Sequence, residues 1–461
     1  MSETRRAGSS AATALVVANM IGTGVFVSLH FQLFTYSAAT PILMLWIVGG
    51  LAALCGALSY AEVAKAMPRS GGEYRFLSEL FHPALGFMAG LLSAVVGFAA
   101  PTALVALALG IYLNRSIPAI PVEAAAVAVI LLGAFSHAMS VRTSGRVQLV
   151  ATTLKLALIA IFLIASLFLP GHGDVRWASQ SEDWKAMFQP AFAASLFWVF
   201  YAYTGWNAAV YGLEEWDQPK RDVKRALVGG TVIVIAIYVA LNAAFLRAAS
   251  MESLKETEAI ADVAAGALFG PGVAHWTSAL LAAGLFSSVS ALLWAGPRVL
   301  GSMGRDMPAL GWFAAQDRPP IRSLVLQAGL AVFFVFYGKI LALFSKPAAG
   351  AVADPSQSKG DLEKLMKYTT VGLTLCSALT VAGLFILWRR GKVGALSLLP
   401  ATLFLIMSAF VIYQSLAMDV GWQSPGWQPG LRVWLTAPTF SGLVTALVCA
   451  LLWFPLNRKS R

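Results

Sequence analysis

Long apolar runs alternate with short polar or proline- and glycine-containing segments along the whole chain. A helix needs about 20 apolar residues to cross the hydrocarbon core of a bilayer, which is about 30 Å thick. Runs of this length predict an all-α polytopic membrane protein with twelve transmembrane helices, at residues 11–34, 40–66, 83–113, 119–138, 146–169, 190–213, 226–249, 272–303, 322–345, 366–388, 394–417 and 435–456.

The first and sixth of these runs are interrupted near their middles. The first carries the sequence GTG at residues 22–24, and the sixth carries TGWN at residues 204–207. Glycine costs about 1 kcal/mol relative to alanine inside a helix, and a helix opened in hydrocarbon leaves backbone N–H and C=O groups that water cannot reach. We therefore expect helices 1 and 6 to be broken. Either a ligand fills the gap, or the glycines only let helices pack closely.

Five helices separate the start of one broken helix from the start of the next, so the second unit enters the membrane from the opposite side. Matching interruptions in two inverted units indicate a binding site near the middle of the membrane. At such a break one half-helix exposes N–H donors and the other exposes C=O acceptors. Donors suit a carboxylate and acceptors suit an ammonium group, so the pattern fits a zwitterionic α-amino acid.

Composition and charge agree with a membrane protein. Of 461 residues, 58% are hydrophobic and 12% are charged, and the mean hydropathy is +0.72, against about 45–50% apolar and about 25% charged residues in soluble proteins. Most of the 33 Lys and Arg residues fall on the side of the bundle that holds both termini. The positive-inside rule places that side in the cytoplasm of a multi-pass plasma-membrane protein. The net charge of +11 then reflects topology and lipid contact rather than nucleic-acid binding.

The residues that carry most enzyme chemistry are not arranged for it. The three cysteines have no CxxC spacing, the five histidines are scattered and form no metal set, and no cofactor is predicted. The chain has no nucleotide-binding loop of the GxxxxGK[ST] type and no nucleophile and base at one depth. We expect no enzymatic activity. A channel or receptor is disfavoured because two broken helices at inverted positions indicate a gated site.

Lys155 is a charge inside the fifth apolar run. It lies nine residues after Arg146, or roughly 13 Å along a helix. A lysine at mid-membrane costs about 2.5–3.5 kcal/mol on insertion scales, so its side chain should face the bundle interior. The alternative is that it extends along the helix to the cytoplasmic interface.

Several motifs together resemble those of the amino acid/polyamine/organocation transporter family. They are IGTGVF at 21–26, PRSGGEYRFLSE at 68–79, YAYTGWN at 201–207, EEWDQPKRDVKRAL at 214–227 and a pattern in the eighth run that ends in Arg298. The resemblance implies the leucine-transporter fold and alternating access. It places a first inverted repeat of helices 1–5 in residues 1–170, a second of helices 6–10 in residues 190–390, and helices 11 and 12 with the tail in residues 394–461.

The resemblance also implies a substrate site. The backbone at Thr23 and Gly24 would bind the substrate carboxylate, and carbonyls of four residues would bind the ammonium group: Met20, Ile21, Tyr201 and Tyr203. The Tyr201 ring would act as a gate, or it packs between helices. Asn207 occupies a position that is acidic in some members with cationic substrates, so its neutral amide favours neutral amino acids.

By the same resemblance, Lys155 replaces the sodium ion of sodium-dependent relatives. It would contact carbonyls near Gly22 and hydroxyls such as those of Ser288 and Ser290, and it could carry a coupled proton. The sequence therefore predicts a sodium-independent, proton-linked or exchanging carrier of neutral L-amino acids in the bilayer, with a cationic amino acid or polyamine antiporter as the alternative. The oligomeric state, and whether Trp294 and residues 99–101 line the pocket, stay open.

Overall fold

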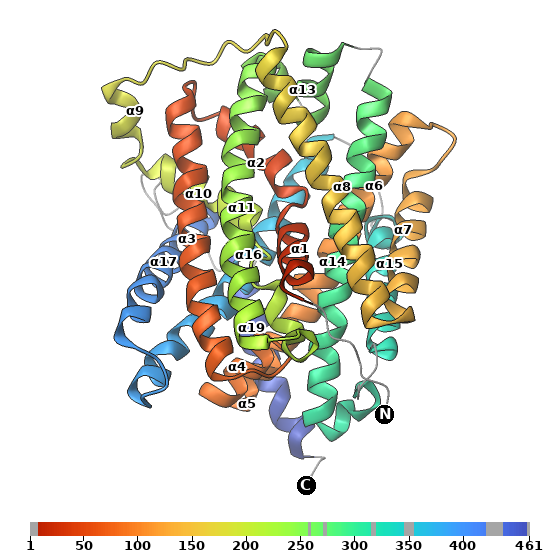
Figure 1. Cartoon of the computed structure of the whole chain (residues 1–461), viewed down its shortest axis with the longest axis vertical. Helices are drawn as coiled ribbons and strands as arrows, with labels where there is room; N and C mark the ends of the chain where they lie inside the picture. The colour runs from red at the N-terminus through yellow and green to blue at the C-terminus, as the bar shows by residue number, and fades with distance from the viewer. Residues whose placement is uncertain are drawn as a thin grey trace.

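The structure is a computed structural model that describes residues 8–256, 260–270, 274–314, 320–344, 355–420 and 437–458. Throughout these residues the chain is helical with connecting loops, and an isolated bridge between Ala38 and Arg176 is the β-type pairing present there (Figure 1). Nine helices in the described part are long and apolar enough to cross a membrane. The chain is thus an all-α protein with the features of a multi-pass membrane protein, while the count of twelve spans stays a prediction.

Three predicted spans are absent from those nine, and two of them are the interrupted runs. The run at 11–34 forms α1 (Ser9–Met20) and α2 (Gly24–Leu33), and the run at 190–213 forms α10 (Pro190–Tyr203) and the 3-10 helix η2 (Ala208–Glu215). Each half is too short to span by itself, because the helix stops where the glycines lie. The third is the run at 322–345, which forms α15 (Ile321–Phe344).

The remaining elements follow in chain order. They are α3 (Ala39–Ala66), α4 (Glu73–Leu80), α5 (Pro83–Leu92), η1 (Ser93–Ala99), α6 (Ala100–Ser116), α7 (Val122–Met139), α8 (Val141–Phe168), α9 (Ser181–Ala186), α11 (Pro219–Ala248), α12 (Met251–Lys255), α13 (Ile260–Phe269), α14 (Ala274–Asp306), η4 (Pro308–Phe313), α16 (Pro355–Arg389), η5 (Ala395–Ser397), α17 (Leu398–Val420) and α19 (Pro438–Arg458). The predicted connections at 347–364 and 419–435 lie largely outside the described residues.

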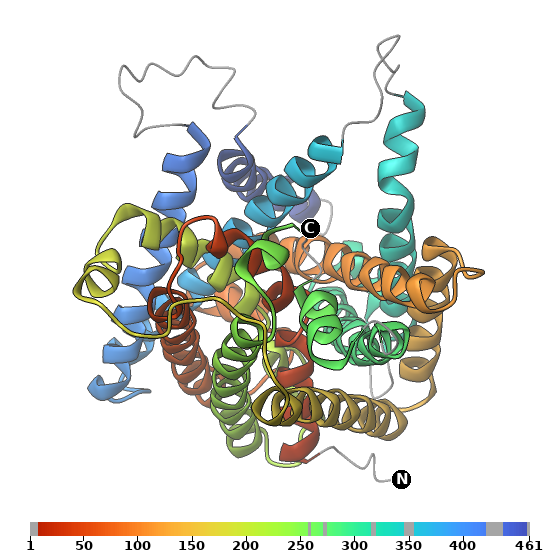
Figure 2. The ribbon, with the colours of Figure 1, turned by 90° about the horizontal axis from the view of Figure 1, so that it is seen from above.

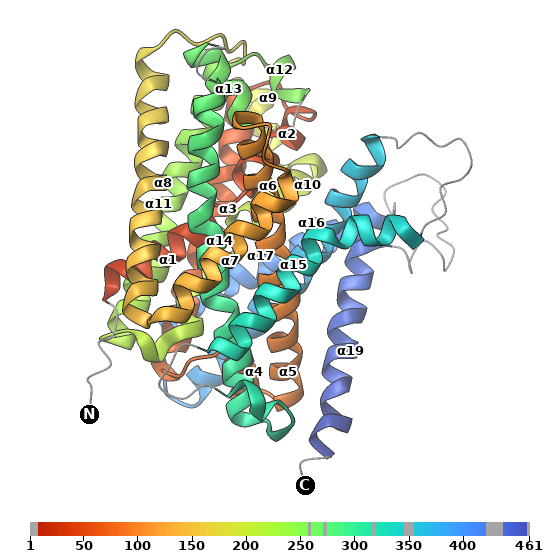
Figure 3. The same cartoon turned by 90° about the vertical axis from the view of Figure 1, so that its right-hand side faces the viewer.

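The broken helix α1–α2 lies inside the bundle. Helix α1 packs against α8, α11 and α14, and α2 packs against α10. Seen from above, α3, α11 and α8 follow one another along one side of the bundle (Figure 2), whereas α19 lies at the edge of the bundle opposite α8 and α11 (Figure 3). The breaks are therefore surrounded by protein, which is where opened backbone is tolerated in a membrane.

Small residues let the helices around the breaks approach closely. A Cβ atom at Gly49 of α3 would lie 2.4 Å from Cγ1 of Val199, and one at Gly50 would lie 2.8 Å from the hydroxyl of Tyr203. Membrane helices associate through such close packing because lipid tails are as apolar as their side chains. These glycines position α10 against α3 and so set the place of the second break.

Helix α8 exposes a row of large apolar side chains on its outer face. The exposed side chains on this face are Val150, Leu154, Ile161, Leu167 and Phe168. In the most apolar stretch of the helix, only 17% of the residues are buried. An exposed apolar face of this length is unfavourable in water but matches lipid tails. The outer face of α8 is thus suited to the bilayer, and its inner face carries Lys155 into the bundle.

A paired carboxylate outside the spans ties the loop before α9 to the bundle. Arg176 donates two hydrogen bonds to Asp183, at 2.8 and 2.6 Å, and its carbonyl accepts from the N–H of Ala39 at 3.0 Å. The hydrogen bonds from Arg176 lower the pKa of Asp183 from its ordinary value. The pair therefore stabilises the fold above the ordinary carboxyl pKa of about 3.9, and this contribution is lost as the pH falls.

We expect Asp183→Asn to lower the melting temperature of the purified protein at pH 7, and the difference from wild type to shrink at pH 4 and below. Thermal unfolding of both proteins at several pH values measures this directly. Glu182→Gln on the same helix, whose side chain is 71% exposed, is the matched control and should change little at any pH. A difference of equal size at pH 7 and pH 3.5 would show that the ion pair is not its source.

Candidate functional site

The first break lies between the end of α1 and the start of α2. Helix α1 ends at Met20 and α2 begins at Gly24, with Thr23 in front of it. The Thr23 side chain makes no capping hydrogen bond. The N–H groups of the first turn of a helix have no partner within that helix and carry its positive dipole end. The start of α2 is accordingly able to bind a carboxylate or another anion.

The second break follows α10 and lies against the first. Gly205 has φ +99, a backbone conformation that side chains disfavour, and a Cβ there would lie 2.8 Å from Nδ2 of Asn19. That Nδ2 atom donates to the carbonyl of Gly205 at 3.3 Å. Glycine is required at this position both for the turn and for the contact, and Asn19 joins the two breaks directly.

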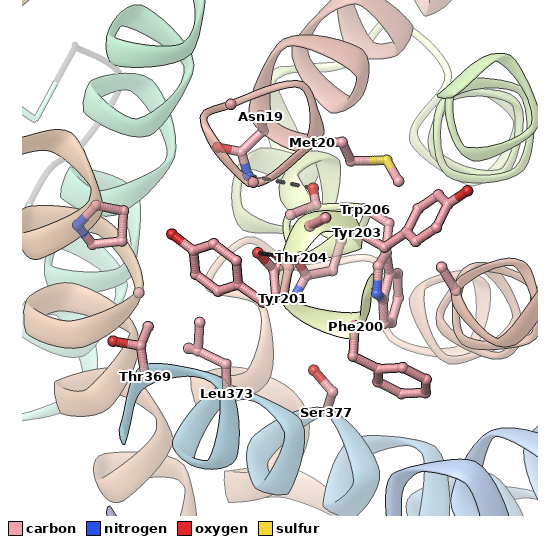
Figure 4. A pocket seen from close by; sticks show the side chains of 18 of the residues that line it. Asn19, Met20, Phe200, Tyr201, Tyr203, Thr204, Trp206, Thr369, Leu373 and Ser377 are labelled. Atoms are coloured by element: carbon pink, nitrogen blue, oxygen red, sulfur yellow. Dashed lines mark hydrogen bonds between the residues drawn. The ribbon is translucent and has the colours of Figure 1, made fainter. Parts of the chain in front are cut away.

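A cavity of about 120 Å³ lies between the two breaks. Its walls come from both broken helices and from α3, α4, η1, α6, α14, α16 and α17. The Tyr201 ring lies between the first break and α16, as Figure 4 shows from the labelled Asn19, Met20, Thr369 and Leu373. Almost all of the lining is uncharged, so the cavity suits a ligand whose charges are met by backbone groups.

The structure brings most of the predicted site residues to this cavity. Its lining includes Met20, Gly22, Thr23, Gly24, Tyr201, Tyr203, Asn207 and Ser288. Tyr201 also interacts with the Thr23 side chain. The Tyr203 side chain points away from Tyr201 (Figure 4), and its hydroxyl donates to the carbonyl of Trp46 at 2.9 Å. Ile21 instead lines a separate apolar cavity of about 270 Å³.

The carbonyls expected to receive an ammonium group already have partners. The carbonyl of Met20 accepts from the Tyr238 hydroxyl at 2.6 Å, and that of Tyr201 accepts from the Thr204 hydroxyl at 2.7 Å. Each also accepts from a backbone N–H group, Met20 from that of Gly22 at 2.8 Å and Tyr201 from that of Thr204 at 3.1 Å. Both lone pairs of each oxygen are therefore used, and an ammonium group would have to displace a donor. An acceptor that we did not anticipate is Oδ1 of Asn19, which is buried without a hydrogen-bond partner. The sequence signal that could have identified Asn19 is its position, because it is a polar residue just before the break.

Lys155 reaches the first break from α8. It is 4% exposed, and its Nζ donates to the carbonyl of Ile21 at 2.6 Å, to Oγ of Ser288 at 2.6 Å and to the carbonyl of Ala18 at 3.5 Å. The Ser288 hydroxyl donates to the same Ile21 carbonyl at 2.7 Å. The side chain therefore points into the bundle and not toward the membrane surface. Its charge links α8, α14 and the end of α1.

Ser290, which was grouped with Lys155 from the sequence, faces a different partner. Its hydroxyl lies 3.0 Å from Nε2 of His137, and its carbonyl lies 2.8 Å from the same atom. His137 also contacts the hydroxyl of Ser144. Two residues along a helix are about 200° apart around its axis, so Ser288 and Ser290 point to different sides of α14. Ser290 belongs to a contact between α7, α8 and α14.

The sequence left open whether Trp294 and residues 99–101 line the cavity, and the structure gives each of them a place. Pro101 lines the cavity, and so do Gly97 and Phe98 of the π-helical segment η1, while Ala99 and Ala100 are not part of its described lining. Trp294 lies outside the cavity: its ring stacks on that of Trp216 at 5.3 Å. A π-helical turn within a longer helix often marks a functional region, and here it turns the middle of the third span toward the cavity.

Ion pairs connect loops and helices at the end of the bundle that holds α4. Arg298 of α14 binds both carboxylate oxygens of Glu215, at 2.6 and 2.7 Å, and its guanidinium lies 3.7 Å from the Trp294 ring centroid. Arg75 of α4 binds Asp306 at 2.6 Å. The Arg298 pair is largely buried, so removing one partner would be costly. These contacts join α4, α14 and η2 at that end.

Glu73 is a cavity residue to which the sequence assigned no role. It is the first residue of α4, is 2% exposed, and lines the cavity beside Asn207. Oε1 of Glu73 accepts hydrogen bonds from Nδ2 of Asn207 and, at 2.9 Å, from the hydroxyl of Tyr60. The sequence motif at 68–79 contains Glu73, but nothing local indicated that α4 would turn its first side chain inward.

The sequence of this chain is similar to those of known amino acid transporters. The sequence profile described as "Amino acid permease" matches residues 8–460. The chain is 25% identical over 427 residues to the human "b(0,+)-type amino acid transporter 1", covering 90% of this chain and 82% of that protein. It is 24% identical over 424 residues to the mouse "Asc-type amino acid transporter 1" (88% and 75%), and 26% identical over 435 residues to the mouse "Large neutral amino acids transporter small subunit 2" (91% and 76%).

Proposed function

The chain belongs to the amino acid permease family, and from this premise we propose that it is a secondary transporter that carries neutral L-amino acids by alternating access without sodium. Family membership and the apolar helices support amino acid transport across a membrane. The observation that supports the substrate class is the cavity between the two broken helices, because backbone donors and acceptors meet there in an almost uncharged lining.

In this proposal the substrate is held by its backbone groups. The N–H groups at Thr23 and Gly24, at the start of α2, bind the carboxylate. The ammonium group is bound by carbonyls of the broken helices, with Oδ1 of Asn19 as a further acceptor. The Tyr201 ring covers the substrate on one side. The side chain of the substrate then extends toward η1 and α16.

Lys155 takes the place of a sodium ion in the same proposal. Its ammonium group meets two carbonyls and one hydroxyl, which are the oxygen ligands that a hard cation would also use. A fixed charge at this position stabilises the open end of α1 without an ion from solution. The division into two inverted repeats, the plasma-membrane location and cytoplasmic termini belong to this proposal as well.

A second candidate function, transport of cationic amino acids, is favoured by one observation. Glu73 lines the cavity, and a carboxylate is the group that would pair with a cationic side chain. Against this, Oε2 of Glu73 is buried, and its other oxygen already has two donors. A cationic side chain would have to displace those donors, so neutral substrates are the preferred proposal.

Thermal unfolding of the purified protein with a panel of ligands tests the substrate class. A ligand that binds the folded state at 100 times its Kd stabilises it by about 2.7 kcal/mol. We expect stabilisation by small neutral L-amino acids and none by their decarboxylated amines, because the carboxylate contact would be missing. Stabilisation by lysine, arginine or polyamines alone would favour the cationic function instead. Amino acid uptake into proteoliposomes with sodium replaced by choline tests the independence from sodium.

A further inference from the structure

Glu73 is a buried acid at the edge of the substrate cavity. Of the described residues that line this cavity, it is the one with a charged side chain. It is 2% exposed, and none of the ion pairs between described residues includes it. An ionised carboxylate buried without a cation is unfavourable, so its surroundings favour binding of a positive charge.

The two carboxylate oxygens of Glu73 differ in their contacts. Oε1 accepts from Tyr60 and Asn207, whereas Oε2 is buried with no hydrogen-bond partner. Two donors on one oxygen hold the carboxyl group in place, and the other oxygen stays available. A proton is small enough to bind there without moving the walls of the cavity, whereas a substrate ammonium group is not.

The titratable groups that face Glu73 from the neighbouring elements are two phenols and a thiol, which are ordinarily neutral at physiological pH. They are Tyr60 from α3, Tyr211 from η2 and Cys376 from α16, and α5 contributes no titratable side chain. On the other face of α4, Arg75 pairs with Glu79 and Asp306. Among the described residues, therefore, no cation lies within ion-pair distance to hold Glu73 ionised.

Glu73 is also connected to the segment that would move with the substrate. Asn207, which donates to it, lies two residues after the Gly205 turn in the second break. The turn before α4 packs closely on the same region, because a Cβ at Gly72 would lie 2.4 Å from the Tyr211 ring. A change in the charge of Glu73 thus acts directly on residues 204–211, and a change in their position acts on Glu73.

Lys155, the other buried charge beside the cavity, is less suited to exchange a proton. Its ammonium group has three donors, and the three acceptors around it are the carbonyls of Ile21 and Ala18 and the hydroxyl of Ser288. The Ser288 hydroxyl donates to Ile21 and so accepts from the lysine. Deprotonation would remove one of these three donors and the charge that strengthens the other two hydrogen bonds, which is costly in a buried site. This geometry suits a permanent cation.

We propose that Glu73 is the group that binds and releases a proton during each transport cycle. The inference rests on the proposed function, since it requires a substrate that crosses with the proton. One proton from one aqueous side binds the free carboxylate oxygen, and the same proton leaves to the other side after the cavity reorients. With a zwitterionic substrate, one positive charge moves per cycle.

Uptake into proteoliposomes with and without an inward proton gradient tests this role. For one proton per substrate, a gradient of one pH unit supports an accumulation ratio of about tenfold. We expect wild type to show this gain and Glu73→Gln to show a ratio of about one, whatever its absolute rate, since the amide accepts the same hydrogen bonds but cannot titrate. Glu79→Gln, on the exposed face of the same helix, should keep the wild-type ratio.

A second measurement covers the case in which Glu73→Gln transports too slowly to compare. A pH-sensitive dye in weak buffer reports proton uptake when a neutral amino acid is added to detergent-purified protein. Wild type and Glu73→Asp should take up protons, and Glu73→Gln should not. If wild type exchanges amino acids but shows no proton-driven accumulation, or if Glu73→Gln keeps it, the assignment of Glu73 is wrong and the proposed function stands. A wild-type protein that neither binds nor exchanges amino acids would overturn the proposed function itself.

Discussion

Lys155→Met is expected to reduce amino acid uptake into proteoliposomes by about 100-fold or more. The substitution removes the ammonium group that donates to Ile21, Ser288 and Ala18, and of these the Ile21 carbonyl keeps a hydrogen bond from the Ser288 hydroxyl. Hydrogen bonds to a charged group contribute about 1.5–3 kcal/mol each, and 1.4 kcal/mol corresponds to a factor of ten. Loss of two such bonds at the break in helix 1 is enough for the expected decrease.

Methionine keeps the length of the side chain, so the variant should still fold. It should be produced in normal amount and should unfold in a single thermal transition. Lys185→Met is the matched control, because Lys185 is 74% exposed on α9 and does not line the cavity. It should transport at the wild-type rate. Wild-type turnover by Lys155→Met would show that the lysine does not support transport. A wild-type protein that requires sodium would show that Lys155 does not replace that ion.

Gly22→Leu is expected to abolish stabilisation by amino acids while leaving the ligand-free protein folded. The nearest atom to a Cβ at Gly22 is Cγ2 of Val105, at 4.0 Å, so the backbone there has room for a side chain. Gly22 also lines the cavity, and a leucine side chain would fill it. The ligand-dependent rise in thermal stability, about 2.7 kcal/mol at 100 times Kd for wild type, should disappear.

The neighbouring glycine provides a contrast. A Cβ at Gly24 would lie 2.7 Å from Cα of Ala202, and this backbone atom cannot turn away as a flexible side chain would. Overpacking of this kind costs about 1–3 kcal/mol. Gly24→Ala should therefore lower the melting temperature without any ligand, whereas Gly22→Ala should not. If Gly22→Leu still gains stability from amino acids, the ligand does not occupy this cavity.

This contrast also bears on the two roles suggested for the GTG sequence. Close packing and ligand binding both require small residues, and the sequence does not separate them. Both glycines line the cavity, but Gly24 also packs closely against Ala202 of α10, whereas Gly22 has no such close neighbour. Substitution of Gly24 alone is a poor test of binding, because it disturbs the contact between α2 and α10 first. The neighbouring positions differ because successive residues at the break point in different directions.

The amino acid sequence by itself determined the helical class and the breaks at residues 22–24 and 204–207, and it favoured an inward direction for Lys155. Each follows from a local cost: apolar runs must cross lipid, glycines end a helix where they occur, and a lysine inside a span avoids the lipid. The motifs also led to the amino acid permease family. Local rules suffice for these features because a bilayer restricts each segment separately.

Only the tertiary structure decided which side chains meet. Glu73 reaches the cavity, Asn19 joins the two breaks, Ser290 pairs with His137 instead of Lys155, and Trp294 stacks on Trp216 outside the cavity. These contacts join segments that are distant in the sequence, and they depend on the rotation and tilt of each helix. Lipid tails and neighbouring helices are equally apolar, so hydrophobicity alone cannot show which face of a span turns inward.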